Sequence, residues 1–215
     1  FFPPGARWTS LTEVRLRDRH GQSAGNIDLV LVSYDDDGRI TDFGSCEIQA
    51  VYISGNVRNP FEHYMADPEG NAGMDWQGEI HYPRPDFLSS SRKRLAPQLQ
   101  FKGGILGGWG KKQAVVLDRP FFDTLPSLSP VPPEEATLAW LVYRLDHDRA
   151  SDTYHLVMDQ TVYTAFEPAL LRVTTAEAGP IDDFVSQLQA KLDSKLGSAA
   201  PDAPTLMDLQ PNEDA

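Results

Sequence analysis

Apolar and polar residues alternate in a way that predicts several β-strands. Residues 26–34 and 39–54 are rich in β-branched and aromatic side chains and flank an Asp-Asp-Asp-Gly turn, which predicts a β-hairpin. Residues 113–118 predict one further strand. Residues 136–145 and 153–163 predict a second hairpin, although the first of these two segments also fits a helix.

Other segments carry the periodicity and the end signals of helices. Thr9 or Ser10 would cap a first helix that ends before Gly21. The last helix is the clearest, because its apolar residues recur every three to four positions and form one stripe, which we expect to be core or a dimer contact. The third helix contains Pro97 and would close at Gly103-Gly104. The helices predicted in this way cover residues 8–20, 58–68, 88–102 and 181–197.

This succession predicts a mixed α/β fold in which helices flank a central β-sheet. We expect one domain over residues 1–197, with a hairpin at 26–53 and a basic segment at 84–112. Residues 198–215 are rich in Ala, Pro and Asp, so we expect a disordered acidic tail.

Composition limits the cellular compartment and the kinds of site that we expect for this chain. No apolar run reaches the length of a membrane span, and no charged-then-apolar leader precedes the first strand or helix, so we expect a cytoplasmic protein without a membrane partner. The single cysteine, Cys46, excludes an internal disulfide and a multi-thiolate zinc site within this chain. The first residue is Phe, so we expect further residues upstream.

The net charge of −12 argues against nucleic acid, but the local charge does not. Residues 84–112 hold seven Lys or Arg residues and one acidic residue. Because local fields steer a partner more than the total charge does, this segment keeps DNA among the possible ligands.

The first hairpin carries acidic residues in an apolar setting. Asp28 lies near the start of one strand, and Glu47, Ile48 and Gln49 lie in the other. An ionised carboxylate inside an apolar sheet is costly unless another group compensates it, and a metal ion is one candidate. Glu47 and Gln49 share one face, because side chains alternate along a strand.

The turn predicts which residues face each other. If Tyr34 faces Arg39, then Asp28 faces Ser45 and Glu47 is its diagonal neighbour. Asp28, Glu47 and the main-chain carbonyl of Ile48 would then suit Mg²⁺, with Glu13 joining through water.

Such a magnesium site has the chemistry of phosphodiester hydrolysis. Gln49 carries no charge and cannot act as a base, so it would orient the attacking water. The alternative is purely structural: Asp28 would pair with Arg15 or Arg17, and Glu47 would face solvent on a twisted edge.

An aspartate followed by E-x-Q on a hairpin resembles the PD-(D/E)XK nuclease core, with glutamine in place of the final lysine. Longer stretches, among them "LTEVRLRD", "GQSAGNIDLVLVSYD", "DFGSCEIQAVYISGNVRNPFEHYM" and "PRPDFLSSSRKRLAPQLQFKGGIL", are similar to NotI-type restriction endonucleases. The likeness covers most of residues 1–130 and continues more weakly to about 190.

The resemblance implies a PD-(D/E)XK restriction-endonuclease-like core and a type II-like, sequence-specific enzyme that cuts double-stranded DNA as a homodimer. It implies a Mg²⁺ cofactor, for which Mn²⁺ can substitute. The family motifs fall on Glu13, Asp28, Glu47 and Gln49. The family also carries a cysteine-ligated iron site, which this chain with its one cysteine does not contain; that module lies upstream of Phe1 or is lacking.

The resemblance favours DNA contacts over the alternative for the basic segment, a solvated helix face. Basic side chains would neutralise phosphates or reach base edges, and serine hydroxyls would contact a phosphate. The alternative function is a catalytically silent or partner-activated DNA-binding module of a defence system. The residues expected at DNA are Arg84, Ser89, Ser90, Ser91, Arg92, Lys93, Arg94, Lys102, Lys111 and Lys112.

Overall fold

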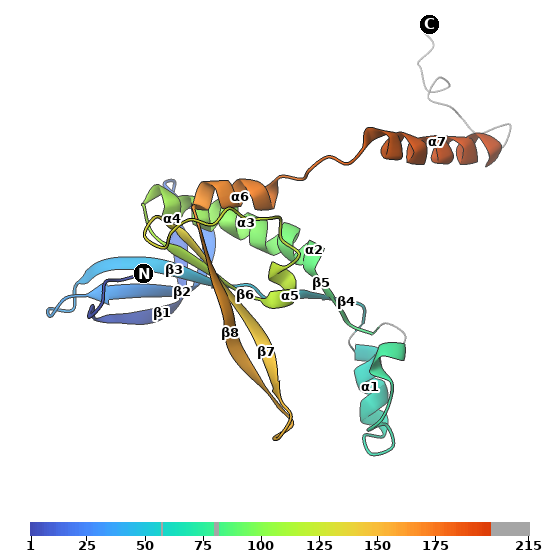
Figure 1. Cartoon of the computed structure of the whole chain (residues 1–215), viewed down its shortest axis with the longest axis horizontal. Coiled ribbons are helices and arrows are strands. Elements are labelled where there is room, and N and C mark those ends of the chain that lie inside the picture. The colour runs from blue at the N-terminus through green and yellow to red at the C-terminus, as the bar shows by residue number, and fades with distance from the viewer. Residues whose placement is uncertain (57, 80–81, 199–215) are drawn as a thin grey trace, which may run out of the picture. The chain divides into compact units, whose positions relative to one another are not determined.

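A mixed β-sheet organises the protein, as the sequence predicted, and this sheet has six strands (Figure 1). The computed structural model describes residues 1–56, 58–79 and 82–198. The strand order is β1-β2-β3-β6-β7-β8, with parallel pairing at β3–β6 and β6–β7 and antiparallel pairing elsewhere. The strands are β1 (Trp8–Arg17), β2 (Ser23–Tyr34), β3 (Ile40–Ile48), β6 (Gln113–Asp118), β7 (Leu138–Asp148) and β8 (Thr153–Thr164).

The chain leaves the sheet after β3 and returns at β6, because parallel strands need a long connection. The connection first forms a two-stranded ribbon of β4 (Tyr52–Ser54) and β5 (Arg84–Asp86), with α1 (Arg58–Ala66) and a short 3₁₀ turn (Trp76–Gly78) between them. A continuous helical run over residues 87–108, here named the crossover helix, then leads to β6. It consists of α2 (Phe87–Ser90), a π-helical turn (Ser91–Leu95), α3 (Ala96–Gln98), a second π-helical turn (Leu99–Gly103) and α4 (Gly104–Gly108).

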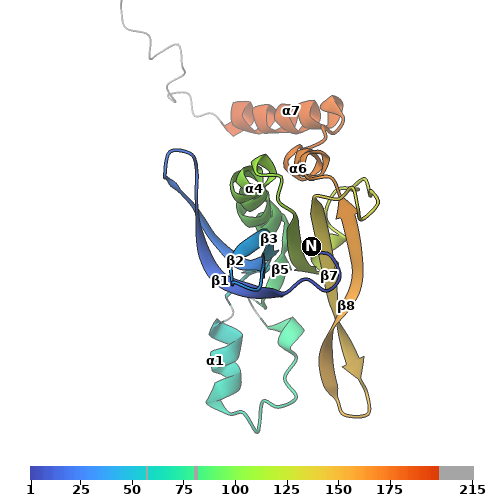
Figure 2. The ribbon, with the colours of Figure 1, turned by 90° about the vertical axis from the view of Figure 1, so that its left-hand side faces the viewer.

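The crossover helix and α6 (Phe166–Thr174) cover one face of the sheet (Figure 2). Leu95 and Leu99 of the crossover helix and Phe166 of α6 belong to one core cluster with side chains of β6 and β7. Trp140 of β7 is completely buried in this cluster, where its indole N–H donates to Thr164 Oγ1 at 3.0 Å. Burial of these apolar side chains fixes the helices on that face.

A second core cluster joins the crossover helix to the first hairpin. Leu106 packs with Val30 and Val32 of β2 and with Leu16 of β1. The crossover helix therefore touches both halves of the sheet.

The predicted helix over residues 8–20 is wrong, because Trp8–Arg17 form strand β1. These residues pair antiparallel with β2 from Trp8↔Ser33 to Arg17↔Ser23. Thr, Val and Leu positions tolerate both structures, and the ladder with β2 decides in favour of a strand.

The third predicted helix exists but is longer than expected. It continues through Gly103, which has helical angles (φ −62°, ψ −38°), and ends at Gly108. Pro97 does not break it, since π-helical turns flank the proline and Ala96 N–H donates to the carbonyl of Ser91, five residues earlier.

The strand predicted over residues 39–54 divides into β3 and β4, which belong to different sheets. The other predicted elements are confirmed. They include the strand at 113–118 and the second hairpin, whose first half is strand β7 and not a helix. A short α5 (Arg119–Phe122) follows β6. No helix among the described residues is long and apolar enough to cross a bilayer.

The chain divides into two compact units, residues 1–175 and 176–215, which are described separately. The nuclease domain expected over 1–197 extends into the second unit. That unit contains α7 (Ile181–Ser198), and its apolar stripe is exposed on this helix. The tail expected at 198–215 lies outside the described residues, apart from Ser198 at the end of α7.

Candidate active site

Asp28 and Glu47 lie side by side on strands β2 and β3. The observed pairing includes Leu29↔Cys46 and Val30↔Ser45, so one further step of the ladder brings Asp28 opposite Glu47. The predicted register, with Asp28 opposite Ser45, is therefore wrong. Two shifts of one residue explain the difference: Tyr34 pairs with Ile40 and not with Arg39, and a bulge between Ser33 and Tyr34 moves the ladder by one more residue.

The sheet register places Glu47 on the face that the helices cover. Glu47 pairs with Val115 of β6, and Val115 pairs with Trp140 of β7, so the three side chains form one row. Val115 and Trp140 belong to the apolar core. Glu47 is accordingly buried, with 8% of its surface exposed, which contradicts the alternative that it faces solvent on an edge.

Asp28 is held by the main chain of the neighbouring strand. Its Oδ2 accepts a hydrogen bond from the N–H of Ile48 at 2.6 Å. The predicted alternative partners lie elsewhere: the Arg17 guanidinium donates to the carbonyl of Gly21 at 2.9 Å, and Arg15 is exposed. The contact with Ile48 ties the Asp28 carboxylate to the E-x-Q strand.

Glu47 has an unusual electrostatic environment. Burial raises the pKa of its carboxyl, the ammonium of Lys102 counteracts this rise, and the nearby charge of Asp28 adds to it. Its Oε2 lies 2.7 Å from Nζ of Lys102, whereas its Oε1 is buried and has no hydrogen-bond partner among the described residues. An unpaired buried carboxylate oxygen is costly, so this oxygen is open to a hydrogen-bond donor or a cation.

Gln49 repeats this feature two residues further along the chain, directly after the end of β3. Its side chain is buried, with 4% exposed, and Nε2 donates to the carbonyl of Ala50 at 3.3 Å. Its Oε1 is buried and, like Glu47 Oε1, has no hydrogen-bond partner. Two free acceptor oxygens therefore come from the E-x-Q motif.

Glu13 reaches the same row of the sheet from β1, not from a helix. Thr12↔Leu29 and Val14↔Ile27 bracket it, so its backbone lies beside Asp28. It has a positive φ of 52°, which interrupts the ladder at this residue. Its Oε2 accepts from Nδ2 of Asn26 at 3.2 Å, and its side chain is exposed.

Lys102 is the site residue whose contacts the sequence did not indicate. It was expected at DNA, but it is buried and its Nζ also donates to the carbonyl of Asn26 at 2.5 Å. A signal was present, because Lys102 occupies a position of the apolar spacing 95–99–102–106 of the crossover helix, which faces the sheet. Its contact with Glu47 replaces the expected contact with a phosphate.

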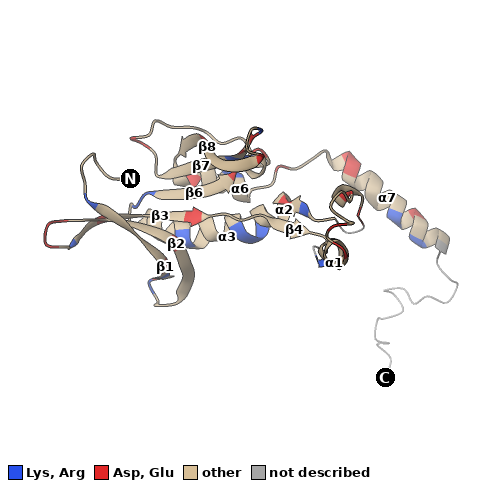
Figure 3. Cartoon of the chain, turned by 90° about the horizontal axis from the view of Figure 1, so that it is seen from below, with Lys and Arg blue, Asp and Glu red and all other residues tan. Residues whose placement is uncertain are grey.

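Several of the other residues expected at DNA remain at the surface. Figure 3 shows basic positions along the crossover helix, beside β2 and β3. Arg84, Arg92, Lys93 and Lys112 are exposed. These side chains are available to a polyanion.

Two further basic residues have partners within the chain. Lys111 pairs with Asp42 at 2.6 Å, and the guanidinium of Arg94 lies 5.5 Å from the ring centroid of Tyr52. Both side chains are partly exposed. A DNA contact would therefore add to these interactions or replace them.

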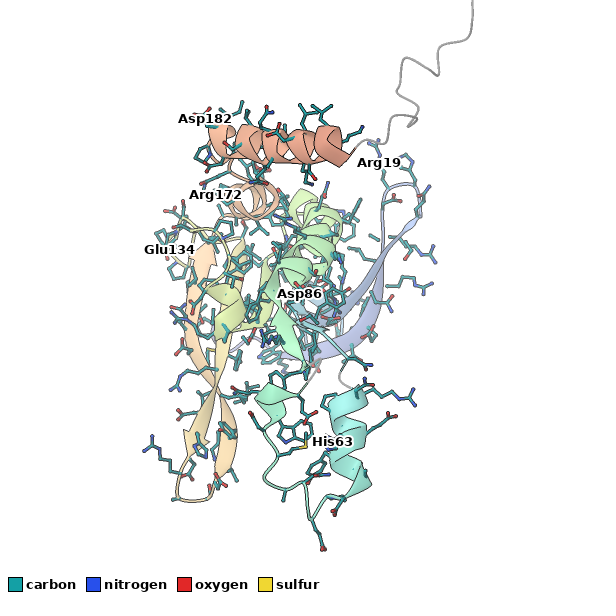
Figure 4. The ribbon with its side chains drawn as sticks, turned by 90° about the vertical axis from the view of Figure 1, so that its right-hand side faces the viewer. Arg19, His63, Asp86, Glu134, Arg172 and Asp182 are labelled. Carbon is teal, nitrogen blue, oxygen red and sulfur yellow. The ribbon has the colours of Figure 1, made fainter. Side chains whose placement is uncertain are left out.

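The serines differ from one another in what they contact. Asp86, labelled in Figure 4, caps the crossover helix by accepting from the N–H of Ser89 at 2.9 Å. Ser90 is completely buried: its hydroxyl donates to the carbonyl of Asp86 and accepts from the N–H of Tyr52, each at 2.7 Å. Ser90 therefore joins the helix to the β4–β5 ribbon and is not available to DNA, contrary to expectation. Ser91 is partly exposed.

Comparison with known proteins identifies the family of this chain. A family model described as "Restriction endonuclease NotI" matches residues 2–156. This chain belongs to the NotI restriction endonuclease family. The family is one of endodeoxyribonucleases, hydrolases that cut DNA at specific sequences. A search of curated proteins found no match to the chain.

The match to the NotI family covers the strands that carry Glu13, Asp28, Glu47 and Gln49 and includes the crossover helix. Among the described residues, no three His, Cys, Asp or Glu side chains gather closely enough to hold a metal by themselves. Mg²⁺ commonly binds through one or two carboxylates and keeps several waters. The two carboxylates of Asp28 and Glu47, of which Glu47 has a free Oε1, fit a site in which waters complete the coordination.

Proposed function

We propose that this NotI-family chain is a type II-like restriction endonuclease that hydrolyses double-stranded DNA with Mg²⁺. Asp28, Glu47, Gln49 and Glu13 are the proposed active-site residues. The observation that carries the proposal is the pairing of Asp28 with Glu47, whose Oε1 is buried without a partner. An ion at this position would compensate both carboxylates.

Asp28, Glu47 and the main-chain carbonyl of Ile48 would hold the cation, and Glu13 would contact it through water. A bound divalent cation lowers the pKa of a coordinated water and neutralises charge on a phosphate. The hydrogen bond from Ile48 N–H keeps Asp28 Oδ2 in place, which leaves Oδ1 for a ligand.

Gln49 would act as an acceptor and not as a base. Its free Oε1 can accept a hydrogen bond from a water and so orient it. The amide cannot take a proton at neutral pH, so proton transfer has to occur elsewhere.

We propose that the exposed basic residues of the 84–112 segment bind the DNA backbone. Arg84, Arg92, Lys93 and Lys112 support this part of the proposal by their exposure, and Ser89, Ser91, Arg94 and Lys111 flank them. Phosphate contacts position a protein on the duplex, whereas base contacts give sequence specificity.

The proposed enzyme acts as a homodimer on a palindromic site. The second hairpin offers a surface for such pairing, because Leu145↔Leu156 and Tyr143↔Met158 are cross-strand pairs on one face, and Leu145, Leu156 and Met158 are more than half exposed. Light scattering of the purified chain tests this. A dimer that Leu156→Glu converts to a monomer supports it, and a monomeric unaltered chain at micromolar concentration contradicts it.

Incubation of the purified chain with plasmid and Mg²⁺ tests the proposed activity. We expect discrete fragments that disappear with EDTA or with Asp28→Ala, while Asp37→Ala, an exposed change in the turn of the same hairpin, cuts normally. Salt-dependent DNA binding without cleavage would favour the silent or partner-activated module instead. Cleavage that Asp28→Ala leaves unchanged would exclude this site.

A further inference from the structure

Lys102 places a positive charge against the proposed active site from inside the protein. Its Nζ lies 2.7 Å from Oε2 of Glu47 and 2.5 Å from the carbonyl oxygen of Asn26. The side chain is 9% exposed, and that of Glu47 is 10% exposed. Lysine is almost never buried to this extent unless it is paired.

The fold makes specific room for this side chain. Gly25 of β2 has a φ of +105°, and a Cβ added there would lie 3.4 Å from Cε of Lys102. Glycine at this position lets the strand pass close to the lysine stem. The π-helical turn over Leu99–Gly103 carries Lys102 at the sheet side of the crossover helix.

The active-site strand has no cation of its own. Its E-x-Q motif ends in Gln49, a neutral side chain with a free acceptor oxygen. Lys102 reaches the carboxylate two residues before Gln49 from an element 55 residues away in sequence. The crossover helix therefore supplies, through Lys102, the positive charge that this strand lacks.

The contact with Lys102 also makes the two carboxylate oxygens of Glu47 different from each other. Oε2 is occupied by the ammonium, and Oε1 is buried and free. A carboxylate fixed through one oxygen presents the other in a defined direction. Groups that fix ligands in this way typically change metal affinity or activity about 10- to 100-fold when they are removed.

We propose that Lys102 is a positioning residue for DNA cleavage, holding Glu47 by Oε2 and supplying from the crossover helix the positive charge that Gln49 does not. The inference rests on the proposed function. It moves Lys102 from the DNA surface to the active site.

Lys102→Met tests the inference, with Arg119→Met as the matched control, because Arg119 also pairs with a carboxylate but at the surface and outside the basic segment. Four quantities are measured for each variant: melting temperature, Mn²⁺ affinity by electron paramagnetic resonance without DNA, DNA affinity in Ca²⁺, and single-turnover cleavage rate at saturating Mn²⁺. For Lys102→Met we expect a rate about 10- to 100-fold lower, as for other groups that orient a ligand. DNA affinity should be unchanged, and Mn²⁺ should bind as tightly as before or more tightly, since a competing cation is gone.

Two further variants test whether the loss of cleavage rate comes from the loss of the positive charge of Lys102. Lys102→Arg should recover part of the rate, and Gln49→Lys combined with Lys102→Met should cut faster than Lys102→Met alone, because both restore a cation beside Glu47. If Lys102→Met does not fold, Lys102→Gln, which keeps a hydrogen-bond donor, is judged by the same four measurements.

The outcomes separate this inference from the proposed function. If the unaltered chain does not cut DNA, both fall. If it cuts and Lys102→Met cuts equally fast, only the role of Lys102 is wrong. A loss of DNA affinity with an unchanged saturated rate would make Lys102 a phosphate contact, and a loss of rate that excess Mn²⁺ fully restores would limit it to metal binding; both results overturn the inference.

Discussion

The Asp28 carboxylate accepts a hydrogen bond from the main-chain N–H of Ile48, with 2.6 Å between Oδ2 and the nitrogen. The contact crosses from β2 to the residue between Glu47 and Gln49. Asp28 therefore does two things that can be separated: it accepts a hydrogen bond that stabilises the hairpin, and it carries a charge beside Glu47.

Asp28→Asn should keep the fold and lose the activity. An amide oxygen can still accept from Ile48 N–H, so the melting temperature should change little, whereas the charge for a cation is lost. Metal charge stabilisation is worth several kcal/mol, and each 1.4 kcal/mol is tenfold in rate, so cleavage should fall about 100-fold or more.

Asp28→Ala is the matched comparison, because it also removes the acceptor. Its free energy of unfolding should fall by about 0.5–1.5 kcal/mol, the net contribution of one hydrogen bond, since this contact is exposed to solvent. Thermal melts and plasmid cleavage measure the two effects. An Asp28→Asn protein that cuts as fast as the unaltered chain would contradict the proposed metal site.

Cys46, a buried residue that precedes Glu47 on β3, should react slowly at pH 8. Burial, then the charges of Glu47 and Asp28, raise the pKa of its thiol from 9.0 to about 11. At pH 8 the thiolate fraction is then about one in a thousand, against about one in ten for an unperturbed thiol. Mass spectrometry of iodoacetamide labelling in EDTA measures this.

The pH dependence has a defined sign. Because the pKa of Cys46 is raised in the folded state, the stability linked to this thiol is complete below pH 9 and is lost as the pH rises toward about 11. The labelling rate of the folded chain should therefore keep rising above pH 10. A rate that levels off near pH 9 would show an unperturbed thiol.

Gly103 and Gly104 are adjacent in the crossover helix, and alanine should have opposite effects at the two positions. A Cβ at Gly103 would lie 2.6 Å from Cε2 of Phe166, a buried ring that has little room to move. Overpacking of this kind typically lowers the free energy of unfolding by about 1–3 kcal/mol.

A Cβ at Gly104 meets no atom within 4 Å. Gly104→Ala should raise the free energy of unfolding by about 0.5–1 kcal/mol, since alanine favours a helix over glycine. Urea unfolding of both variants measures the difference. Equal effects would mean that the crossover helix does not pack on α6 as described.

Arg92 and Lys93 should contribute to DNA affinity through phosphates. Both are exposed on the first π-helical turn of the crossover helix. Their joint replacement by Ala should weaken binding and reduce the slope of log affinity against log salt by about two, one for each phosphate contact.

Fluorescence anisotropy in Ca²⁺ at several salt concentrations gives this slope. Lys191→Ala, an exposed lysine of α7, is the control and should leave the slope unchanged. A double variant with the slope of the unaltered chain would remove these residues from the proposed interface.

The sequence alone determined the β-hairpin, the crossover helix and the pair of acidic strands that carry Asp28 and Glu47. These follow from local patterns: β-branched runs around a turn, apolar spacing in helices, and the alternation that places Glu47 and Gln49 on one face. The likeness to NotI-type enzymes was also contained in the order of residues, and the family match bears it out.

Only the tertiary structure decided three further points. Residues 8–17 became a strand because β2 pairs with them along their whole length, from Trp8↔Ser33 to Arg17↔Ser23, and local propensity does not register this pairing. The pairing of Tyr34 with Ile40 and the bulge between Ser33 and Tyr34 together set the register that brings Asp28 opposite Glu47.

The third point is Lys102. Its position in a basic segment of the sequence predicted a DNA contact. What a side chain on a helix contacts, however, depends on the surface against which the helix packs. Positions 95, 99, 102 and 106 of the crossover helix face the sheet and are buried against it. A buried ammonium is costly unless a carboxylate pairs with it. Glu47, distant in sequence and adjacent in space, is that carboxylate.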